Sequence, residues 1–321
     1  MNSIRSLFTA MCLMAFALAP AFAAYPEKPV RIVVAYAPGG ATDVLARKMA
    51  QKLTEQMGQT FFVENKPGAT GIIGTQYVAR APADGYTLLA MDNTYEILPY
   101  AFKSLPWNHE TAFAPITVIA FSPVLICVRT QSPFKDLKEL LVAARANPGK
   151  LSYGTGGTGS APHFATEAFQ QAAGIKLTHV PYKGAGDAMT ALISGEVALI
   201  FVSTPGAGAQ LQGGRIRSLA ISGKKRFAAW PDIPTFAEAG VPGFGVTNWT
   251  GLAAPADTPK AVIDRLYQEA VKAFETPDMK KFVAELGSEP GGNAPDAYAR
   301  LIREESAGWA GVAQKADIER Q

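Results

Sequence analysis

Short apolar runs alternate along the chain with segments of helical periodicity. Val30–Tyr36 is rich in β-branched residues, which favour a buried strand, and Pro38-Gly39-Gly40 ends it. Thr42–Gln56 then carries its apolar residues at helical spacing. Up to residue 91 the pattern predicts strands at 30–36, 61–64 and 85–91 and helices at 42–56 and 72–80. This order predicts a mainly parallel sheet covered by helices.

A second series of the same kind begins after Pro123. It predicts strands at 124–128, 151–153, 176–180, 197–202 and 217–222 and helices at 137–146 and 161–173. An apolar run at 249–255 leads into a helix that Thr258 would N-cap, with Pro259 in its first turn. Its buried face would carry Val262, Leu266, Ala270 and Phe274. A last helix at 296–314 would bury Tyr298, Leu301, Ile302, Trp309 and Val312. Two series of similar size predict two lobes.

The N-terminal residues predict export. Leu7–Leu18 is almost entirely apolar, follows a single cation and precedes Ala21-Phe22-Ala23. That order is typical of a secretory signal peptide over residues 1–23. A membrane anchor is disfavoured because the apolar run is shorter than the roughly 20 residues that span a bilayer, and Pro20 interrupts it. A lipid anchor at Cys12 is disfavoured because the residues before it make a poor lipobox. We therefore expect a free, exported protein.

Composition narrows the classes further. The chain has 321 residues and a formal charge of +3, and the first 23 residues carry one Arg and no acid, which leaves +2 for the rest. So small and dispersed a charge gives no reason to expect nucleic-acid binding. Beyond the leader, Cys127 is the one cysteine of the sequence, so no internal disulfide is expected.

Two Gly-rich bends mark the candidate chemistry. Pro38–Asp43 and Gly154–Ser160 each join a predicted strand to a predicted helix. Helix N-termini expose unpaired N–H groups and partial positive charge, which suit carboxylates and phosphates. Either bend alone is more simply explained as a turn and a helix cap. Matching positions in two lobes favour a cleft that binds an anion.

The sequence offers little support for catalysis. Gly154–Gly159 lacks both the early position and the ribose-binding acid of a dinucleotide loop, and no Lys-Ser/Thr pair ends it. His109, His163 and His179 have no metal-ligand spacing, and there is no Gly-x-Ser-x-Gly elbow. We therefore expect no cofactor, no metal and no catalytic residue. Two roles stay open for His163, a hydrogen bond to a ligand or simple packing, and Asp43 would cap its helix, reach the ligand through water, or both.

Eight runs of residues, taken in order, resemble the substrate-binding proteins of tripartite tricarboxylate transporters, the Bug family. The resemblance covers nearly the whole chain after the leader. The runs are 25–34 (YPEKPVRIVV), 37–47 (APGGATDVLAR), 63–69 (VENKPGA), 82–89 (PADGYTLL), 180–184 (VPYKG), 231–235 (PDIPT), 238–240 (EAG) and 249–252 (WTGL).

The resemblance implies a two-lobed, type II-like periplasmic binding protein whose lobes close on a ligand. The first lobe would combine 24–121 with 249–321, and the second would be 122–248. The protein would act as a monomer in the periplasm and deliver a small organic carboxylate to a membrane permease. The ligand-binding residues implied by position, including a wall after the strand at 197–202, are Ala37, Gly39, Gly40, Thr42, Asp43, Thr94, Thr158, Ser160, His163, Val202 and Ser203.

One position departs from the family pattern. Family members often carry an acid where this chain has Val202. An acid there would suit an ammonium group, so the apolar residue favours an acid without an amine, with aromatic carboxylates as the leading subgroup. Position 202 would otherwise be only packing. Two other functions compete with transport: a sensor subunit for a membrane kinase, which would have the same fold, and an enzyme acting on a carboxylate.

Overall fold

The computed structural model describes residues 25–321, so the predicted signal peptide at 1–23 lies outside the described residues. The strands are β1 (Val30–Val34), β2 (Phe61–Asn65), β3 (Thr87–Asp92), β4 (Phe113–Arg129), β5 (Ser152–Thr155), β6 (Thr178–Pro181), β7 (Leu199–Ser203), β8 (Ile216–Ile221), β9 (Thr247–Pro255) and β10 (Glu289–Pro290). The helices are α2 (Ala41–Met57), the short 3-10 helix η1 (Ala69–Gly71), α3 (Ile72–Ala79), α4 (Thr94–Ala101), α5 (Leu137–Ala146), α6 (Ala161–Ala173), α7 (Ala185–Ser194), α8 (Thr204–Gln212), α9 (Lys260–Glu275), α10 (Pro277–Glu285) and α11 (Pro295–Lys315).

The strands form two sheet regions that share β4. The strand order is β2-β1-β3-β9-β4-β7-β5-β6, with β10 and β8 also paired to β4. Pairing is parallel among β1, β2 and β3 and among β5, β6 and β7. The strands β4 and β9 pair antiparallel with each other and with their neighbours, so both regions are mixed where these strands enter. The α/β prediction is confirmed, and the parallel pattern holds for the strands that alternate with helices.

β4 is much longer than the sequence predicted. It runs for 17 residues from Phe113, whereas the expected strand began at residue 124. Pro115 and Pro123 lie within it, and the register against β9 shifts next to Pro115. The sequence prediction missed the first half of this strand because a proline lacks the N–H that continues a sheet ladder and therefore indicates a break in a strand. The first half of β4 pairs with β9 and the second half with β7 and β8.

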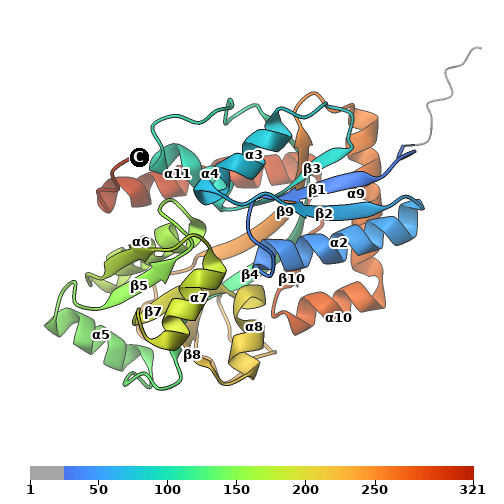
Figure 1. The fold of residues 1–321 in the computed structure, drawn as a ribbon. Coiled ribbons are helices and arrows are strands. Elements are labelled where there is room, and N and C mark those ends of the chain that lie inside the picture. The colour runs from blue at the N-terminus through green and yellow to red at the C-terminus, as the bar shows by residue number, and fades with distance from the viewer. Residues whose placement is uncertain (1–24) are drawn as a thin grey trace, which may run out of the picture.

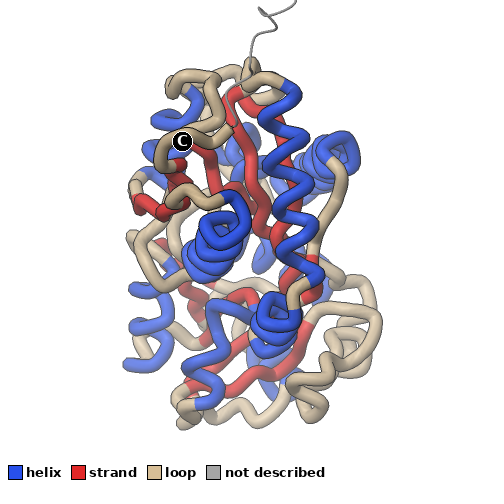
Figure 2. Tube along the Cα trace, turned by 90° about the vertical axis from the view of Figure 1, so that its right-hand side faces the viewer, coloured by secondary structure: helices blue, strands red, loops and turns tan. Residues whose placement is uncertain are grey.

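Helices cover both sheet regions. Figure 1 shows β1, β2 and β3 with α2 and α9 in the upper part of the molecule and β5, β7 and β8 with α5, α7 and α8 in the lower part. Figure 2, turned by 90°, shows helices on both sides of the strands. In the upper part, Ile32 and Leu88 are fully buried with Leu45 of α2 and Leu266 of α9. On the opposite face, Val33 and Leu89 pack with Val78 of α3 and Tyr298 of α11, so helices cover both faces of the sheet.

A separate aromatic core fills the lower part. The rings of Phe169, Phe201, Phe236 and Phe244 lie 4.5–6.0 Å apart between centroids. A further apolar cluster joins the two parts, because α6 contributes Phe164 and α11 contributes Trp309 to it. The C-terminal helix therefore packs on both lobes.

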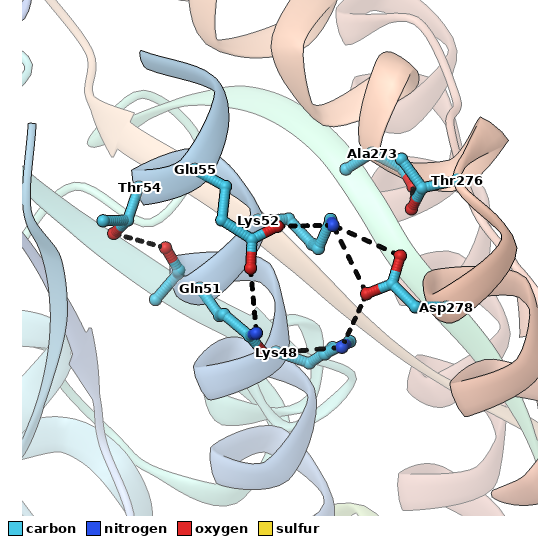
Figure 3. Close-up of polar contacts among 9 residues, drawn as sticks. Lys48, Gln51, Lys52, Thr54, Glu55, Ala273, Thr276 and Asp278 are labelled. Atoms are coloured by element: carbon cyan, nitrogen blue, oxygen red, sulfur yellow. Dashed lines mark hydrogen bonds and ion pairs between the residues drawn. The ribbon is translucent and has the colours of Figure 1, made fainter. Parts of the chain in front are cut away.

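An ion-pair network fastens α10 to α2 (Figure 3). Asp278 at the start of α10 lies 2.9 Å from Lys48 Nζ and 3.2 Å from Lys52 Nζ, both on α2. Lys52 also pairs with Glu55 one turn further along α2, at 2.6 Å. Hydrogen bonds from Lys48, Thr276 and Lys52 lower the pKa of Asp278. Asp278 therefore stays ionised and holds the two helices together.

Some predicted details were wrong or missing. Thr258 does not cap α9, because the Pro259 carbonyl accepts the first helical hydrogen bond and Pro259 therefore occupies the N-cap position. The Thr258 hydroxyl is instead buried without a hydrogen-bond partner. The helices α4, α7, α8 and α10 were not predicted. Among residues 25–321, no helix is both long and apolar enough to cross a membrane.

Candidate functional site

The first Gly-rich bend is held in place by Asp43. Its carboxylate accepts the Gly39 N–H at 2.9 Å, the Asn65 amide at 2.9 Å and the Arg47 guanidinium at 3.0 and 2.9 Å. Burial opposes ionisation, but the hydrogen bonds from Arg47, Gly39 and Asn65 outweigh it and lower the pKa of Asp43. With both oxygens engaged inside its own lobe, this carboxylate shapes the bend around Gly40.

Asp92 forms a second polar centre where β3 ends. It accepts the Tyr36 hydroxyl, the Thr42 hydroxyl and the Thr94 N–H, each at 2.9 Å. Burial raises the pKa of Asp92 in spite of these donors. The arrangement ties together the end of β1, the first turn of α2 and the first turn of α4. Three chain segments are thus fixed beside one another at the carboxyl ends of parallel strands, where ligands of such sheets bind.

The second Gly-rich bend is braced from within. The Ser160 hydroxyl donates to the Gly157 carbonyl at 2.7 Å, and the Ser160 N–H donates to the same carbonyl at 3.2 Å. Thr155 Oγ1 accepts the Gly157 N–H at 3.3 Å. Ser160 is the N-cap residue of α6, but its side chain makes no capping hydrogen bond. Its hydroxyl therefore maintains the shape of the loop in this structure.

His163 lies in the first turn of α6 within a column of stacked rings. Its ring lies 4.1 Å from that of His179, which lies 4.9 Å from that of Tyr153. Burial and the neighbouring His179 lower the pKa of His163 to about 3, and burial lowers that of His179 to about 4. Both imidazoles are neutral at pH 7. Because Nδ1 of His163 accepts the Gly159 N–H at 3.2 Å, the proton of the neutral ring is on Nε2. His163 thus has a donor available beside the loop.

The two bends meet across the lobes through α4. The N–H of Ala161, at the start of α6, donates to the Thr94 hydroxyl at 3.3 Å. A Cβ placed on Gly159 would lie 2.5 Å from Cβ of Ala101, at the end of α4, so the glycine permits close packing. The predicted residues Thr42, Asp43, Thr94, Thr158, Ser160 and His163 thus belong to loops and helix starts that these contacts bring together.

The remaining predicted residues occupy the rims. Ala37, Gly39 and Gly40 form the turn before α2, where Ala37 and Gly39 are exposed. Val202 and Ser203 end β7 and lead into α8, which packs beside α2. The next residue, Thr204, donates to the carbonyl of Gly287, which follows α10, at 2.9 Å. Phe201 packs in the aromatic core, and Val202 packs against a separate apolar cluster that includes Leu125 and Ile200.

Several polar residues of this region were not predicted. They are Tyr36, Thr70, Asp92, Asn93 and His179. Thr70, Asp92 and His179 bond or stack with the predicted residues Thr158, Thr94 and His163, whereas Tyr36 bonds to Asp92 and Asn93 to Trp249. Asp92 and Asn93 follow a buried strand directly, which was the one available signal. Among the described residues, no group of three or more His, Cys, Asp or Glu side chains is placed to hold a metal ion.

A buried carboxyl pair lies behind α4. The Asn93 amide donates to Glu96 at 3.2 Å and to Glu305 of α11 at 2.8 Å, so both carboxyls converge on one nitrogen. Trp309 donates to Glu96 at 2.8 Å and Trp249 to Glu305 at 3.0 Å. Burial and the Glu305 charge raise the pKa of Glu96 to about 10, and burial raises that of Glu305. The pair therefore keeps a proton at neutral pH.

Comparisons with known proteins agree with this architecture. The sequence profile described as "Tripartite tricarboxylate transporter family receptor" matches residues 45–318. The UPF0065 protein in the tcbD-tcbE intergenic region of Pseudomonas sp. (strain P51) is 37% identical over 89% of this chain and 85% of that protein. Protein BugT of Bordetella pertussis is 32% identical over 91% of this chain and 90% of the BugT chain.

Solved structures extend the likeness to the fold. R. palustris Rpa4515 with adipate is 34% identical, has a TM-score of 0.89, and is matched over 92% of this chain and all (100%) of that one. MatC from Rhodopseudomonas palustris with bound malate is 31% identical, has a TM-score of 0.84, and is matched over 90% of this chain and 100% of that one. The TM-scores show that both share the fold of the present protein. The chain therefore belongs to the tripartite tricarboxylate transporter receptors, a family of periplasmic solute-binding proteins that includes the Bug proteins.

Proposed function

We propose that this protein captures a small organic carboxylate between its lobes and delivers it to a membrane permease of the tripartite tricarboxylate type. The supporting observation is the convergence of three helix starts, those of α2, α4 and α6, held together by Asp92 and by the contact between Thr94 and Ala161. Helix N-termini favour negative charge. The neighbours solved with adipate and with malate support a carboxylate as the ligand.

The division of the chain follows the shared strands. We assign residues 24–121 and 249–321 to the first lobe and residues 122–248 to the second. The pairing of β9 with both β3 and β4 supports a first lobe built from two separate segments. We also propose that residues 1–23 direct export and are removed, so that the protein works as a free monomer in the periplasm.

The ligand-contacting groups proposed are those of the two bends and their rims. They are Ala37, Gly39, Gly40, Thr42, Asp43, Thr94, Thr158, Ser160, His163, Val202 and Ser203. Thr158 and the Nε2–H of His163 are the donors we expect from the second lobe. Asp43, whose oxygens already accept four N–H groups, would contribute by shaping the bend.

The polar groups around the two bends favour an acid without an amine. An ammonium group needs a carboxylate or several acceptors when it is taken out of water. Position 202 is apolar, and both oxygens of Asp43 are engaged. We propose amine-free mono- or dicarboxylates as the substrate class, with aromatic acids as the leading subgroup.

Titration calorimetry and thermal shift with adipate, malate, benzoate, glutamate and aspartate test the function and the ligand class together. A ligand at 100 times its dissociation constant stabilises the protein by about 2.7 kcal/mol, which raises the melting temperature measurably. We expect binding of at least one amine-free acid. Tighter binding of glutamate or aspartate would refute the ligand class. Tighter binding of adipate than of benzoate would remove the aromatic preference. If no compound binds in a screen of mono-, di- and tricarboxylates, aromatic acids and amino acids, the proposed function is refuted.

Two variants test the second bend. Thr158→Ala should weaken binding of the acid found above about ten- to a hundredfold, since a hydrogen bond to a charged group is worth roughly 1.5–3 kcal/mol. Ser160→Ala should also weaken binding, because the loop loses the hydrogen bond that holds the Gly157 carbonyl. Thr190→Ala is the control, because that hydroxyl donates to Gly186 O within α7. Calorimetric affinities equal to the parent in both variants would reduce the bend to a turn.

A sensor role for a membrane kinase would leave the binding site unchanged. The two functions differ in the membrane partner, so transport is tested by uptake of the radiolabelled acid. Deletion of the gene should abolish uptake and spare ligand-induced transcription. The reverse result would favour the sensor.

A further inference from the structure

The turn that precedes α3 has an unusual backbone. Ala69 and Thr70 both adopt positive φ, 46° and 53°, although neither is a glycine. Side chains with a Cβ avoid this left-handed region, and successive residues in it persist only where other contacts hold them. Gly68 and Gly71, on either side, also have positive φ. The turn therefore presents Thr70 in a conformation that the local sequence alone would not select.

Thr70 reaches the second lobe. Its hydroxyl donates to the Thr158 carbonyl at 3.0 Å, across 88 residues of sequence. The loop that receives it is shaped for the contact, because a Cβ on Gly157 would lie 3.0 Å from Thr70 Oγ1, and the φ of 134° at Gly157 is one that glycine tolerates. The two surfaces thus fit each other at this point.

The contact fixes one peptide plane from both ends. The Thr158 carbonyl and the Gly159 N–H belong to the same planar peptide group and point in opposite directions. The carbonyl accepts from Thr70, while the N–H donates to Nδ1 of His163 at 3.2 Å. The hydrogen bond to His163 lies within the second lobe, whereas the hydrogen bond from Thr70 comes from the first lobe. The second lobe alone therefore supplies only one of the two hydrogen bonds that restrain this peptide.

We propose that Thr70 is a positioning residue of the ligand site, which locks the Thr158–Gly159 peptide where the lobes meet. The bend at 154–160 therefore depends on a residue from outside the second lobe for its binding shape. This keeps the partial negative charge of the Thr158 carbonyl directed at a donor. The proposal deepens the proposed function, on which its relevance to the ligand rests, whereas the contact between Thr70 and Thr158 is a feature of the fold itself.

Amide hydrogen exchange of the ligand-free, full mature protein tests the proposal. Thr70→Ala should increase exchange in peptides covering 154–160 several-fold, while exchange in the core strands β1 and β3 and the melting temperature stay near those of the parent. Thr70→Ser should restore slow exchange, because it keeps the hydroxyl. Thr190→Ala is the matched control, a threonine that bonds within its own helix, and should behave like the parent.

Thr70→Gly guards against a folding defect, since glycine relieves the positive φ while removing the hydroxyl. It should fold and exchange as fast as the alanine variant. Parent-like exchange at 154–160 in both Thr70→Ala and Thr70→Gly would overturn the proposal, as would fast exchange in Thr70→Ser. These results do not depend on whether any acid binds, so a failure of the carboxylate assays and a failure of the Thr70 proposal are separate outcomes.

Discussion

Single polar side chains in this protein act mainly on the backbone beside them. Asp43 accepts a hydrogen bond from the N–H of Gly39, and His163 accepts one from the N–H of Gly159. In both cases the side chain comes from the first turn of the helix that follows the bend. Each bend is thereby shaped by the helix it precedes, and its remaining groups are left to meet a ligand.

The neutral state of His163 has a consequence for acid stability. The native pKa of about 3 lies below the value of 6.5 of a free imidazole. Between these values the unfolded chain binds the proton and the native protein does not, so stability falls as the pH falls from 6.5 toward 3. His163→Asn keeps an acceptor for Gly159 and cannot titrate. We expect this variant to lose less stability on acidification, by up to about 1.4 kcal/mol per pH unit.

Urea unfolding at pH 7.5, 6.0 and 5.0 measures this difference. The values at pH 7.5, where the imidazole is neutral in both states, provide the baseline for each protein. Curves of stability against pH that run parallel for the variant and the parent would show that His163 does not titrate as described.

At the scale of elements, the contact between α2 and α10 is electrostatic (Figure 3). Asp278→Asn removes the negative charge that Lys48 and Lys52 share, while Lys52 retains Glu55. We expect several-fold faster amide exchange in α10, with exchange in α2 less affected because its apolar face stays buried. Glu285→Gln is the control, since that exposed residue pairs only within α10.

The prediction concerns a partly exposed network, so added salt should reduce the difference. Exchange in α10 that is equal in Asp278→Asn and in Glu285→Gln would show that packing alone holds the helix.

Elements with uninterrupted periodicity were predicted well from the sequence, and those with irregular composition were not. The helices at 137–146 and 161–173 match α5 and α6 in both bounds. By contrast, α4 contains Pro99, and α8 contains Pro205 with two glycines, which are read as breakers. Packing against neighbours decides these helices, and a single sequence does not contain that information.

The same distinction applies to the site. The two bends were found because strand, bend and helix follow one another in the chain. Asp92 and Thr70 were missed because their partners are remote in sequence: Thr42 and Asp92 are 50 positions apart, and Thr70 and Thr158 are 88 positions apart. Which bends meet is set by the arrangement of the strands.

At the scale of the whole molecule, the Glu96–Glu305 pair links α4, α11 and the start of β9. The native pKa of Glu96, about 10, exceeds the value of 4.5 of a free carboxyl. The native protein therefore keeps a proton that the unfolded chain has lost, and stability falls as the pH rises from 4.5 through 10. Glu96→Gln retains the geometry without the titration, so its stability should depend less on pH, by up to about 1.4 kcal/mol per pH unit between pH 7 and 9.

Denaturant titrations at pH 6, 7.5 and 9 compare this variant with Glu304→Gln, whose exposed carboxyl neighbours Glu305 in sequence. The control should follow the parent. If Glu96→Gln also follows the parent, the pair is ionised and the shared proton is absent.

The position of β9 has a consequence for how the chain folds. This strand lies between β3 and β4, yet it begins at residue 247, after every residue of β4 to β8. Because the chain is synthesised from its N-terminus, the edges of β3 and β4 that pair with β9 stay unpaired until residues 247–255 have been made. Pairings between such distant residues form slowly, and open edges attract other strands. We therefore expect folding of the first lobe to be completed last, and chains that end before β9 to aggregate.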